Sequence, residues 1–500
     1  MPSTADYIRI LPEIVLSVWG MMVMFIEAMM PAGRSRKGLG LFSAVGVIVA
    51  LAATRCQASP QFAGFGFNRM LRVDHFSIFF HVVVLLVALA TILMSLDYLP
   101  FQKMDYGEYY ALILLGAVGM CLMSSAVELV LIFIALEISS IASYVLAGFR
   151  RHSAESAESS LKYFLLGSFA TGFFLYGVAL LYGATGSTNV FDIATALTSA
   201  THIEPLAYVA VALIFTGLGF KVACAPFHVW TPDVYEGAPS PVVAFMSTAP
   251  KAAAFAVLIR LVIDTGSPHW FWVVYVAAVL SMSIGNLGAI LQTNVKRMLA
   301  YSSIAHAGYL MVAFASAANH ELGISAAMFY SAAYAAMNVG AFAVITHMAG
   351  TGERFQQLDD YSGLGRRSPV LAAALTFFLL SLIGIPMTGG FFAKFYVFSA
   401  AIRTQLIWLT IIGMVNSGMG SYYYLRLIVR MYMFEPQTKE PAPRVRFGVG
   451  MAIAISLLAT LWLGLFPNMV LHYTQSAPTT ITQSAPAAIT QPAPTVIAGH

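Results

Sequence analysis

Five ionisable side chains stand inside otherwise apolar stretches of the sequence: Glu137, Lys221, Lys251, His306 and Lys394. A lysine at the centre of a bilayer costs at least ~2.5 kcal/mol on insertion scales. Three such lysines are therefore hard to explain by packing alone. We interpret the group as acid–base residues suited to moving protons within a membrane.

Lysine suits proton transfer because burial disfavours its ammonium form, whereas a nearby carboxylate favours it. Arginine could not alternate in this way because it stays charged. The structural alternative is a polar group that joins two helices by a hydrogen bond. For His306, which can be buried in the neutral form, the structural alternative explains the residue as well as proton transfer does. It is the better one for Glu128, Arg260 and Arg403, which lie near the ends of apolar runs and are predicted at the membrane interface.

The elements that must position these residues are membrane-spanning helices. Hydrophobic residues make up 59% of the 500 and charged residues 10%, whereas soluble domains carry about 25% charged residues. Apolar runs long enough to cross ~30 Å of hydrocarbon recur along the chain. About fourteen spans are predicted, in an all-α polytopic membrane protein. They lie near Ile14–Met30, Leu39–Ala53, Phe76–Leu96, Tyr109–Phe149 (two spans), Tyr163–Tyr182, Leu206–Ala223, Val242–Ile263, Trp270–Leu291, Met298–Ala315, Ile324–Met348, Val370–Ala401, Leu406–Tyr424 and Val449–Phe466.

Two of these spans should be broken beside a lysine. Pro226 follows Lys221, and its ring clashes with the carbonyl four residues back. The sequence GIPMTGG (384–390) precedes Lys394 and must interrupt a run that is otherwise too long for a bilayer. Lys251 comes directly after Pro250, about ten residues into its span. Glu137 lies nine residues past the turn at Glu128, which places it ~13 Å deep.

The order of these features repeats along the chain. A carboxylate and a broken-span lysine come first, and a histidine and a second broken-span lysine follow, with offsets of 306 − 137 = 169 and 394 − 221 = 173. Five spans separate Glu137 from His306 and Lys221 from Lys394. Because five is an odd number, the second unit should be inverted in the membrane relative to the first, as in many ion transporters. The predicted units are spans 1–3 (1–107), two inverted five-helix repeats (108–265 and 266–435), span 14 (436–472) and a disordered low-complexity tail (473–500).

Lysine and arginine are unevenly distributed between the predicted loops. Seventeen follow odd-numbered spans, Lys296 among them, and six lie on the other side. Because basic loops stay in the cytoplasm, both termini are predicted on the non-cytoplasmic side of a bacterial inner membrane. The three cysteines form no CxxC or Cys/His cluster, no nucleotide-binding glycine motif is found, and the net charge of +4 does not suggest nucleic-acid binding.

Four longer motifs resemble those of a known family, the antiporter-like membrane subunits of respiratory complex I, NADH-quinone oxidoreductase. They are LEISSIASYVLAGF (136–149), FHVWTPDVYEGAPSPVVAFMSTAPKAAAF (227–255), VKRMLAYSSIAHAGY (295–309) and GGFFAKFYVF (389–398). The resemblance covers all fourteen spans and leaves only the tail outside. The YEGAPSPV form and a lysine at 394 fit one kind of these subunits. A second kind has a glutamate at that position, and a third adds a long lateral helix.

The resemblance implies a role for each residue. Glu137 would pair with Lys221 in one half-channel, Lys251 would connect to the second half, and His306 and Lys394 would be the relay and exit groups. This chain would hold no cofactor, and NADH, FMN, iron–sulfur clusters and quinone would belong to partner subunits. The partners would be neighbouring antiporter-like and small membrane subunits and the lipid bilayer.

Two other functions remain open from the sequence. An Mrp-type cation/proton antiporter subunit would share the buried lysines. A membrane scaffold would use its buried charges only to specify helix packing.

Overall fold

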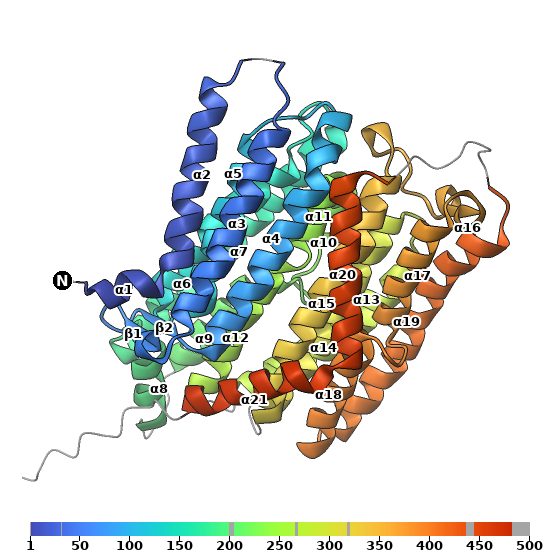
Figure 1. Cartoon of the computed structure of the whole chain (residues 1–500). Coiled ribbons are helices and arrows are strands. Elements are labelled where there is room, and N and C mark those ends of the chain that lie inside the picture. Colours follow the sequence, from blue (N-terminus) through green and yellow to red (C-terminus); the bar gives the residue numbers. More distant parts are fainter. Residues whose placement is uncertain are drawn as a thin grey trace, which may run out of the picture.

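The chain folds as a helical bundle with one two-stranded sheet (Figure 1), as seen in a computed structural model that describes residues 2–31, 33–199, 205–265, 269–317, 321–436 and 445–482. The α-helices are α1 (Thr4–Arg9), α2 (Leu11–Met29), α3 (Lys37–Gln57), α4 (His75–Phe101), α5 (Glu108–Ser125), α6 (Leu129–Ala147), α7 (Ala154–Thr185), α8 (Val190–Ser199), α9 (Pro205–Val222), α10 (Trp230–Gly237), α11 (Ser240–Met246), α12 (Ala249–Thr265), α13 (His269–Ile290), α14 (Val295–Ala317), α15 (Glu321–Met348), α16 (Leu364–Arg367), α17 (Pro369–Ile383), α18 (Gly389–Arg403), α19 (Ile407–Met433), α20 (Phe447–Leu465) and α21 (Pro467–Thr482). Short 3₁₀ helices are η1 (Pro60–Phe62), η2 (Thr351–Glu353) and η3 (Leu358–Tyr361), and the antiparallel strands are β1 (Gly64–Gly66) and β2 (Leu71–Val73).

The predicted spans are confirmed as long apolar helices. Within the described residues, twelve are long and apolar enough to cross a membrane: α2 to α7, α9, α11 with α12, α13, α14, α15 and α20. The broken pair α17 and α18 and the long helix α19 occupy the places of the predicted twelfth and thirteenth spans. Large apolar side chains on the outer helices are exposed, as expected where lipid takes the place of water.

The break beside Lys221 has the position that Pro226 predicts. Helix α9 ends at Val222, and Ala223 has a positive φ of 59°. The freed polar groups of this loop find partners inside the bundle. The indole Nε1 of Trp230 donates to the carbonyl oxygen of Phe220 at 3.0 Å, and the amide nitrogen of Ala225 donates to the hydroxyl of Ser281 at 2.8 Å. An irregular segment can therefore persist at this depth.

The span that carries Lys251 is also interrupted, which the sequence analysis did not predict. Helix α11 ends at Met246 and α12 begins at Ala249, with Ser247 and Thr248 between them. Both hydroxyls donate back to the carbonyl oxygen of Ala244, at 3.0 and 2.7 Å. Lys251 therefore lies in the first turn of a helix rather than in its middle.

The GIPMTGG sequence separates α17 from α18. Gly384 ends α17 with a φ of 97°, and Met387 has a φ of 67°. The start of α18 lies so close to α17 that a Cβ atom on Gly390 would be 1.8 Å from the carbonyl oxygen of Ser381. Only glycine fits at this position.

We expect Gly390→Ala to lower the stability of the folded chain by about 1–3 kcal/mol, because the methyl group must push two helices apart. Gly418→Ala is the matched control, since nothing lies within 4 Å of a Cβ there and alanine favours a helix. Thermal unfolding of the detergent-solubilised protein would measure both. An unfolding midpoint for Gly390→Ala equal to that of Gly418→Ala would contradict the packing argument.

One end of the bundle carries the N-terminus, the β1–β2 hairpin, α8 and α21 (Figure 1). Helix α21 lies across this end and packs against α15 and α4. The prediction of a disordered tail from residue 473 is wrong for residues 473–482, which belong to this helix. The ring of Tyr473, the first residue of the predicted tail, packs against the rings of His75 and Phe79 on α4, and this contact holds the start of the tail against the bundle. The rest of the predicted tail, 483–500, lies outside the described residues.

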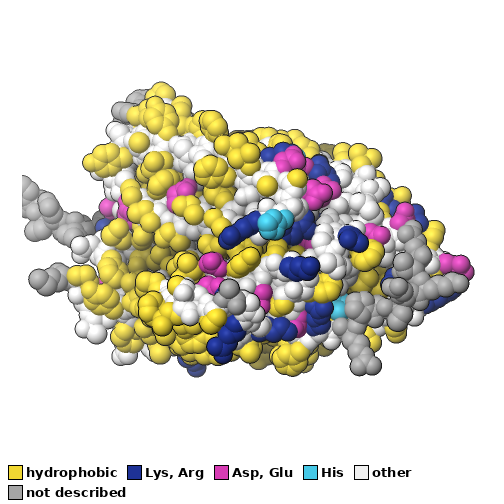
Figure 2. All heavy atoms as spheres, turned by 90° about the horizontal axis from the view of Figure 1, so that it is seen from above, with side chains coloured by type: hydrophobic (Ala, Val, Ile, Leu, Met, Phe, Trp, Pro, Cys, Tyr) yellow, Lys and Arg dark blue, Asp and Glu magenta, His cyan; other side chains and the backbone are white. Residues whose placement is uncertain are grey.

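The opposite end of the bundle carries many charged side chains. Figure 2 shows basic and acidic side chains gathered across the middle of this end, with hydrophobic side chains around them. The loops here include those that the lysine and arginine asymmetry assigns to the cytoplasm. The side of the membrane on which this end lies stays a prediction.

Candidate functional site

Lys221 lies on the last turn of α9 and is almost completely buried. Its ammonium group donates to the hydroxyl of Ser140 on α6 at 2.9 Å. The rings of Tyr144 and Tyr163 lie 6.0 and 5.9 Å from the same nitrogen, so aromatic faces provide further favourable contact with a cation. All these contacts are with neutral groups.

Glu137 lies on α6 one turn before Ser140, on the side that approaches Lys221. Its carboxylate oxygen Oε1 is buried without a hydrogen-bond partner in the described residues. No ion pair within 4.0 Å joins it to Lys221 in this part of the chain, although the two charges interact across the intervening space. The predicted partners are therefore neighbours that do not touch, which leaves room for Lys221 to change its interaction with the carboxylate.

Lys251 is buried at the start of α12 and points toward α14. Its ammonium group donates to the hydroxyl of Ser303 at 2.6 Å, and that hydroxyl also accepts from Tyr334 at 2.8 Å. The ring of Tyr235 lies 5.9 Å from the nitrogen. Lys251, like Lys221, is surrounded by hydroxyl and aromatic groups.

An aromatic row connects the surroundings of Lys221 and Lys251. Tyr163 stacks on Trp230 with ring centroids 4.3 Å apart, and Trp230 lies 6.3 Å from Tyr235. Tyr163 borders the first lysine and Tyr235 the second. The helix break after α9 brings Trp230 into this row, so the interruption and the aromatic connection have the same structural origin.

His306 lies on α14, one turn beyond Ser303, and is buried between tyrosines. Its Nδ1 is 2.6 Å from the hydroxyl of Tyr330, and its Nε2 is 3.3 Å from the hydroxyl of Tyr424. His306, Lys251 and Tyr330 also line a small cavity of about 20 Å³. A cavity of this size holds about one water molecule, which could hydrogen-bond to several of these groups.

Lys394 lies on α18 and points back to the helix break. Its ammonium group donates to the carbonyl oxygen of Ile383 at 2.9 Å and to the hydroxyl of Ser417 at 2.8 Å. It therefore satisfies a carbonyl that the end of α17 leaves free. The ring of Tyr309 separates Lys394 from His306, at 5.0 Å from the lysine nitrogen and 5.7 Å from the imidazole ring.

The structure thus brings the predicted residues into one order along the bundle. Serine and tyrosine hydroxyls, which can both donate and accept hydrogen bonds, lie beside successive ionisable groups, whereas Trp230 between Tyr163 and Tyr235 can only donate. Such a row can pass a proton when water completes it. The predicted site residues are adjacent in pairs rather than in one cluster.

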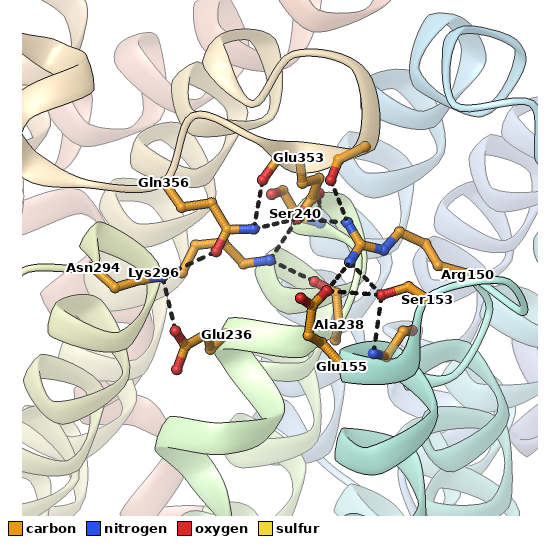
Figure 3. A network of polar contacts seen from close by, with 12 residues as sticks. Arg150, Ser153, Glu155, Glu236, Ala238, Ser240, Asn294, Lys296, Glu353 and Gln356 are labelled. Atoms are coloured by element: carbon orange, nitrogen blue, oxygen red, sulfur yellow. Dashed lines mark hydrogen bonds and ion pairs between the residues drawn. The ribbon is translucent and has the colours of Figure 1, made fainter.

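A second buried charge cluster was not predicted. Glu353 follows α15, and its Oε2 lies 2.6 Å from the ammonium group of Lys296 and 3.8 Å from Nη1 of Arg150. Figure 3 shows Lys296 and Arg150 approaching Glu353 from opposite sides. The Oε1 atom accepts from Tyr98 at 2.5 Å and from the backbone nitrogen of Ser240 at 2.7 Å. Five segments of the chain meet at this one carboxylate.

This cluster corrects the placement of Lys296, which was assigned to an exposed basic loop. The side chain is fully buried at the start of α14 and also donates to the carbonyl oxygen of Ala238 at 2.6 Å. Burial alone would raise the pKa of Glu353, but the charges of Lys296 and Arg150 outweigh it and hold the pKa below its ordinary value. The carboxylate is therefore ionised at neutral pH.

Arg260 also departs from its prediction as an interfacial residue. Its side chain is 1% exposed, and its Nη2 lies 2.9 Å from Oδ1 of Asp74, the residue that caps the start of α4. Burial would raise the pKa of Asp74, yet the charges of Arg260 and Arg72 lower it. Glu128 caps α6 by accepting from the amide nitrogen of Leu131 at 2.7 Å, and Arg403 is exposed at the end of α18; their position at the membrane interface stays a prediction.

No group of three or more histidine, cysteine, aspartate or glutamate side chains that could hold a metal ion lies in the described ranges.

Comparisons with known proteins agree with this architecture. The family described as NADH:quinone oxidoreductase/Mrp antiporter, transmembrane, matches residues 126–420. A relative from Koribacter versatilis, named NADH-quinone oxidoreductase subunit N 2, is 63% identical over 475 residues, which cover 94% of this chain and 96% of the relative. Subunit N from Trichlorobacter lovleyi is 45% identical over 473 residues, which cover 94% of this chain and 96% of the relative.

Solved structures extend the comparison to three dimensions. A chain of respiratory complex I from Thermus thermophilus with bound aureothin is 36% identical and has a TM-score of 0.79, covering 92% of this chain and 98% of its own. A chain of the Mrp complex from Dietzia sp. DQ12-45-1b is 22% identical with a TM-score of 0.82, covering 97% and 98%. At that identity the second match shows the fold alone.

Proposed function

Because the chain belongs to the NADH:quinone oxidoreductase/Mrp antiporter family, we propose that it is the subunit-N-type membrane subunit of an NADH-quinone oxidoreductase. In this role it would move protons across the membrane while electrons pass from NADH to quinone in other subunits. The YEGAPSPV sequence and the lysine at 394 support subunit N among the antiporter-like subunits. The relatives named subunit N, which match more than nine tenths of this chain, support the same assignment.

The observation that carries this proposal is the environment of the three lysines. Each is held by a serine hydroxyl and an aromatic ring, and none has a carboxylate within hydrogen-bond distance in the described chain. A lysine that stays permanently charged inside the bundle would be stabilised best by a carboxylate, and these three lack one at that distance among the described residues. A lysine with neutral partners can exist with or without its proton, as a relay requires.

The proposed path begins at Lys221 with Glu137 as its modulator. Protons would pass from there to Lys251, then to His306, and leave through Lys394. The serines and tyrosines between these groups, with water in the small cavity, supply the intermediate hydrogen bonds. Driving energy must arrive through contacts with neighbouring membrane subunits, because the path itself contains only acid–base groups.

The proposal assigns the redox chemistry to partner subunits. NADH, FMN, iron–sulfur clusters and quinone would bind there, and this chain would act as part of a translocase without a redox site of its own. Its neighbours would be another antiporter-like subunit and small membrane subunits. We also propose that residues 108–265 and 266–435 are inverted repeats that form the two half-channels. Both termini would lie on the non-cytoplasmic side of the membrane.

The competing function is an Mrp-type cation/proton antiporter subunit, because a chain of the Dietzia Mrp complex has the same fold. Such a subunit would exchange Na⁺ for protons without quinone reduction. A second alternative, a membrane scaffold, would not need its lysines to titrate.

Lys251→Ala tests the proposal in membrane vesicles from cells that assemble the complex. We expect NADH-driven proton uptake to fall by about tenfold or more, since an acid–base group in a relay contributes at least that much, while the amount of assembled complex stays unchanged. Proton uptake that follows an Na⁺ gradient without NADH would support the antiporter instead. Unchanged NADH-driven uptake would support the scaffold.

A further inference from the structure

A second set of buried ionisable groups lies among the N-terminal helices, away from the lysine path. Glu13 is on the first turn of α2, and His81 is on α4, facing it. Gln57, the last residue of α3, completes the group. These helices precede residue 126, where the match to the family begins. None of the roles described above uses them.

Glu13 is a buried carboxyl group without hydrogen-bond partners in the described residues. Its side chain is 3% exposed, and neither carboxylate oxygen has a hydrogen-bond partner within the described residues. The nearest group of opposite potential charge is His81, whose Nε2 lies 3.5 Å from Oε1 of Glu13. An ionised carboxylate without a hydrogen-bond donor is very costly in such a place. The protonated acid avoids that cost.

The hydrogen bonds of His81 identify which of its nitrogens carries a proton. The amide nitrogen of Gln57 donates to the carbonyl oxygen of Arg9 at 2.5 Å, so its oxygen must face the other way. That oxygen lies 3.2 Å from Nδ1 of His81. Because it can only accept, Nδ1 must be the donor.

The opposite nitrogen, Nε2, then carries no proton, and in this neutral form its hydrogen-bond partner is the hydroxyl of Ser125, which can donate, and not the carbonyl of Cys121, which cannot. Nε2 lies 2.9 Å from the hydroxyl of Ser125 and 3.0 Å from the carbonyl oxygen of Cys121. When the 3.5 Å gap closes to hydrogen-bond distance, a proton on Glu13 can pass from the carboxyl oxygen to Nε2. This transfer converts a neutral acid and imidazole into a carboxylate and an imidazolium. The imidazolium would donate to the carbonyl of Cys121, and the pair would keep the same net charge.

We propose that Glu13 and His81 form a second proton-holding site, in which a proton rests on the Glu13 carboxyl and can pass to Nε2 of His81. Gln57 connects this site to a cavity of about 420 Å³ at the hairpin end of the bundle, which Asp74 and Arg72 also line. That cavity is large enough to hold water. The site therefore exchanges its proton at the end that carries the N-terminus.

The other charged groups around the site already have partners. Asp74 is held by Arg72 and Arg260, and Arg9 by Asp6. The remaining titratable neighbour is the thiol of Cys121 on α5, whose backbone oxygen faces His81. Because α12 carries both Arg260 and Lys251, a shift of this helix would change the field at His81 and so the position of the proton.

Infrared difference spectroscopy of the assembled complex in membranes tests the site, because a protonated carboxyl absorbs apart from a carboxylate. We expect the wild type to show a protonated-carboxyl band near neutral pH that Glu13→Gln removes. Gln57→Leu should keep the band and slow its shift after transfer into D₂O. The matched control is Glu155→Gln, which replaces a carboxylate that is 80% exposed and should remove no such band.

Further variants keep the test decisive if the glutamine variant does not assemble. Glu13→Asp should move the band, and His81→Phe should shift it because the acceptor nitrogen is lost. A wild-type spectrum that Glu13→Gln and Glu13→Asp leave unchanged in the carboxyl region would overturn the site. Exchange that is equally fast in Gln57→Leu would overturn the connection to the cavity.

Discussion

Replacing Lys221 with alanine is expected to lower NADH-driven proton uptake by about a hundredfold, within the range for loss of a positioned acid–base group. The lysine begins the proposed path, and the small alanine leaves Ser140 and the aromatic rings without a proton carrier between them. Uptake by membrane vesicles, normalised to the amount of assembled complex, measures the effect. Lys103→Ala is the matched control, since Lys103 is an exposed lysine just after α4.

Lys221→Arg separates proton transfer from the mere presence of positive charge. Arginine keeps a cation near Glu137 but does not release its proton at accessible pH. We expect this variant to assemble better than Lys221→Ala and to pump equally poorly. Restored pumping with arginine would show that Lys221 acts as a fixed charge. Normal pumping in Lys221→Ala would remove it from the path altogether.

The helix breaks beside Lys221 and Lys394 could be predicted because their causes are local in the sequence, whereas the interruption at Ser247 and Thr248 was not predicted. A proline ring excludes a helical carbonyl four residues back, so Pro226 places the end of α9 beside Lys221 whatever surrounds it. The glycines of GIPMTGG act in the same local way, through the left-handed conformation of Gly384 and the close approach at Gly390. The depth of Glu137, which residue spacing and the rise of a helix predict, stays a prediction.

The partners of buried charges could not be predicted, because they lie far apart in the sequence. Lys296 stands beside Arg297 at the start of α14, next to a loop that resembles a basic cytoplasmic segment. Its partner Glu353 follows the next helix, α15. Arg260 and Asp74 are still farther apart in the sequence, by 186 residues against 57 for Lys296 and Glu353. Hydropathy gives the depth of a residue but not the direction in which it faces within the bundle. Acidic residues placed near span ends, here Asp74 and Glu353, were the available signal for these clusters.

The predicted contact between Glu137 and Lys221 shows a different limit. Residue types and depth placed the two groups at the same level, and the structure agrees on their proximity. Which group takes the lysine's hydrogen bond depends on the rotation of α6 about its axis, and Ser140 is one turn from Glu137. A hydrogen bond from Lys221 to Glu137 would be a fixed ion pair. Because Lys221 bonds Ser140 one turn away, its interaction with Glu137 can change.

Replacing Glu353 with glutamine is expected to destabilise the folded chain by about 3–5 kcal/mol, the usual cost of removing one partner from a buried ion pair. The change keeps the shape of the side chain but leaves Lys296 fully buried against a neutral amide. The thermal unfolding midpoint of the solubilised complex, and its abundance in membranes, should both fall. Asp359→Asn is the matched control, because Asp359 pairs with Arg430 on the surface at 3.0 Å and such pairs contribute at most ~1 kcal/mol.

The effect of Glu353 should also depend on pH in a defined direction. The charges of Lys296 and Arg150 hold its pKa below the ordinary 4.5, so its stabilising contribution is complete above that pH. It is lost only as pH falls through the lower folded-state pKa. The ionisation of Glu353 should therefore add no pH dependence to the difference in unfolding midpoint between wild type and Glu353→Gln from about pH 8 to 5.

A second substitution identifies the cause of this destabilisation. If the buried ammonium is responsible, Glu353→Gln with Lys296→Met should regain part of the lost stability, because an apolar side chain needs no partner. The double variant loses the charge pair but keeps the hydrogen bonds from Tyr98 and Ser240 to residue 353. Recovery would show that the cluster holds the two halves of the bundle through charge balance. A double variant less stable than Glu353→Gln would instead assign the stability to the contacts of Lys296 with the carbonyl of Ala238.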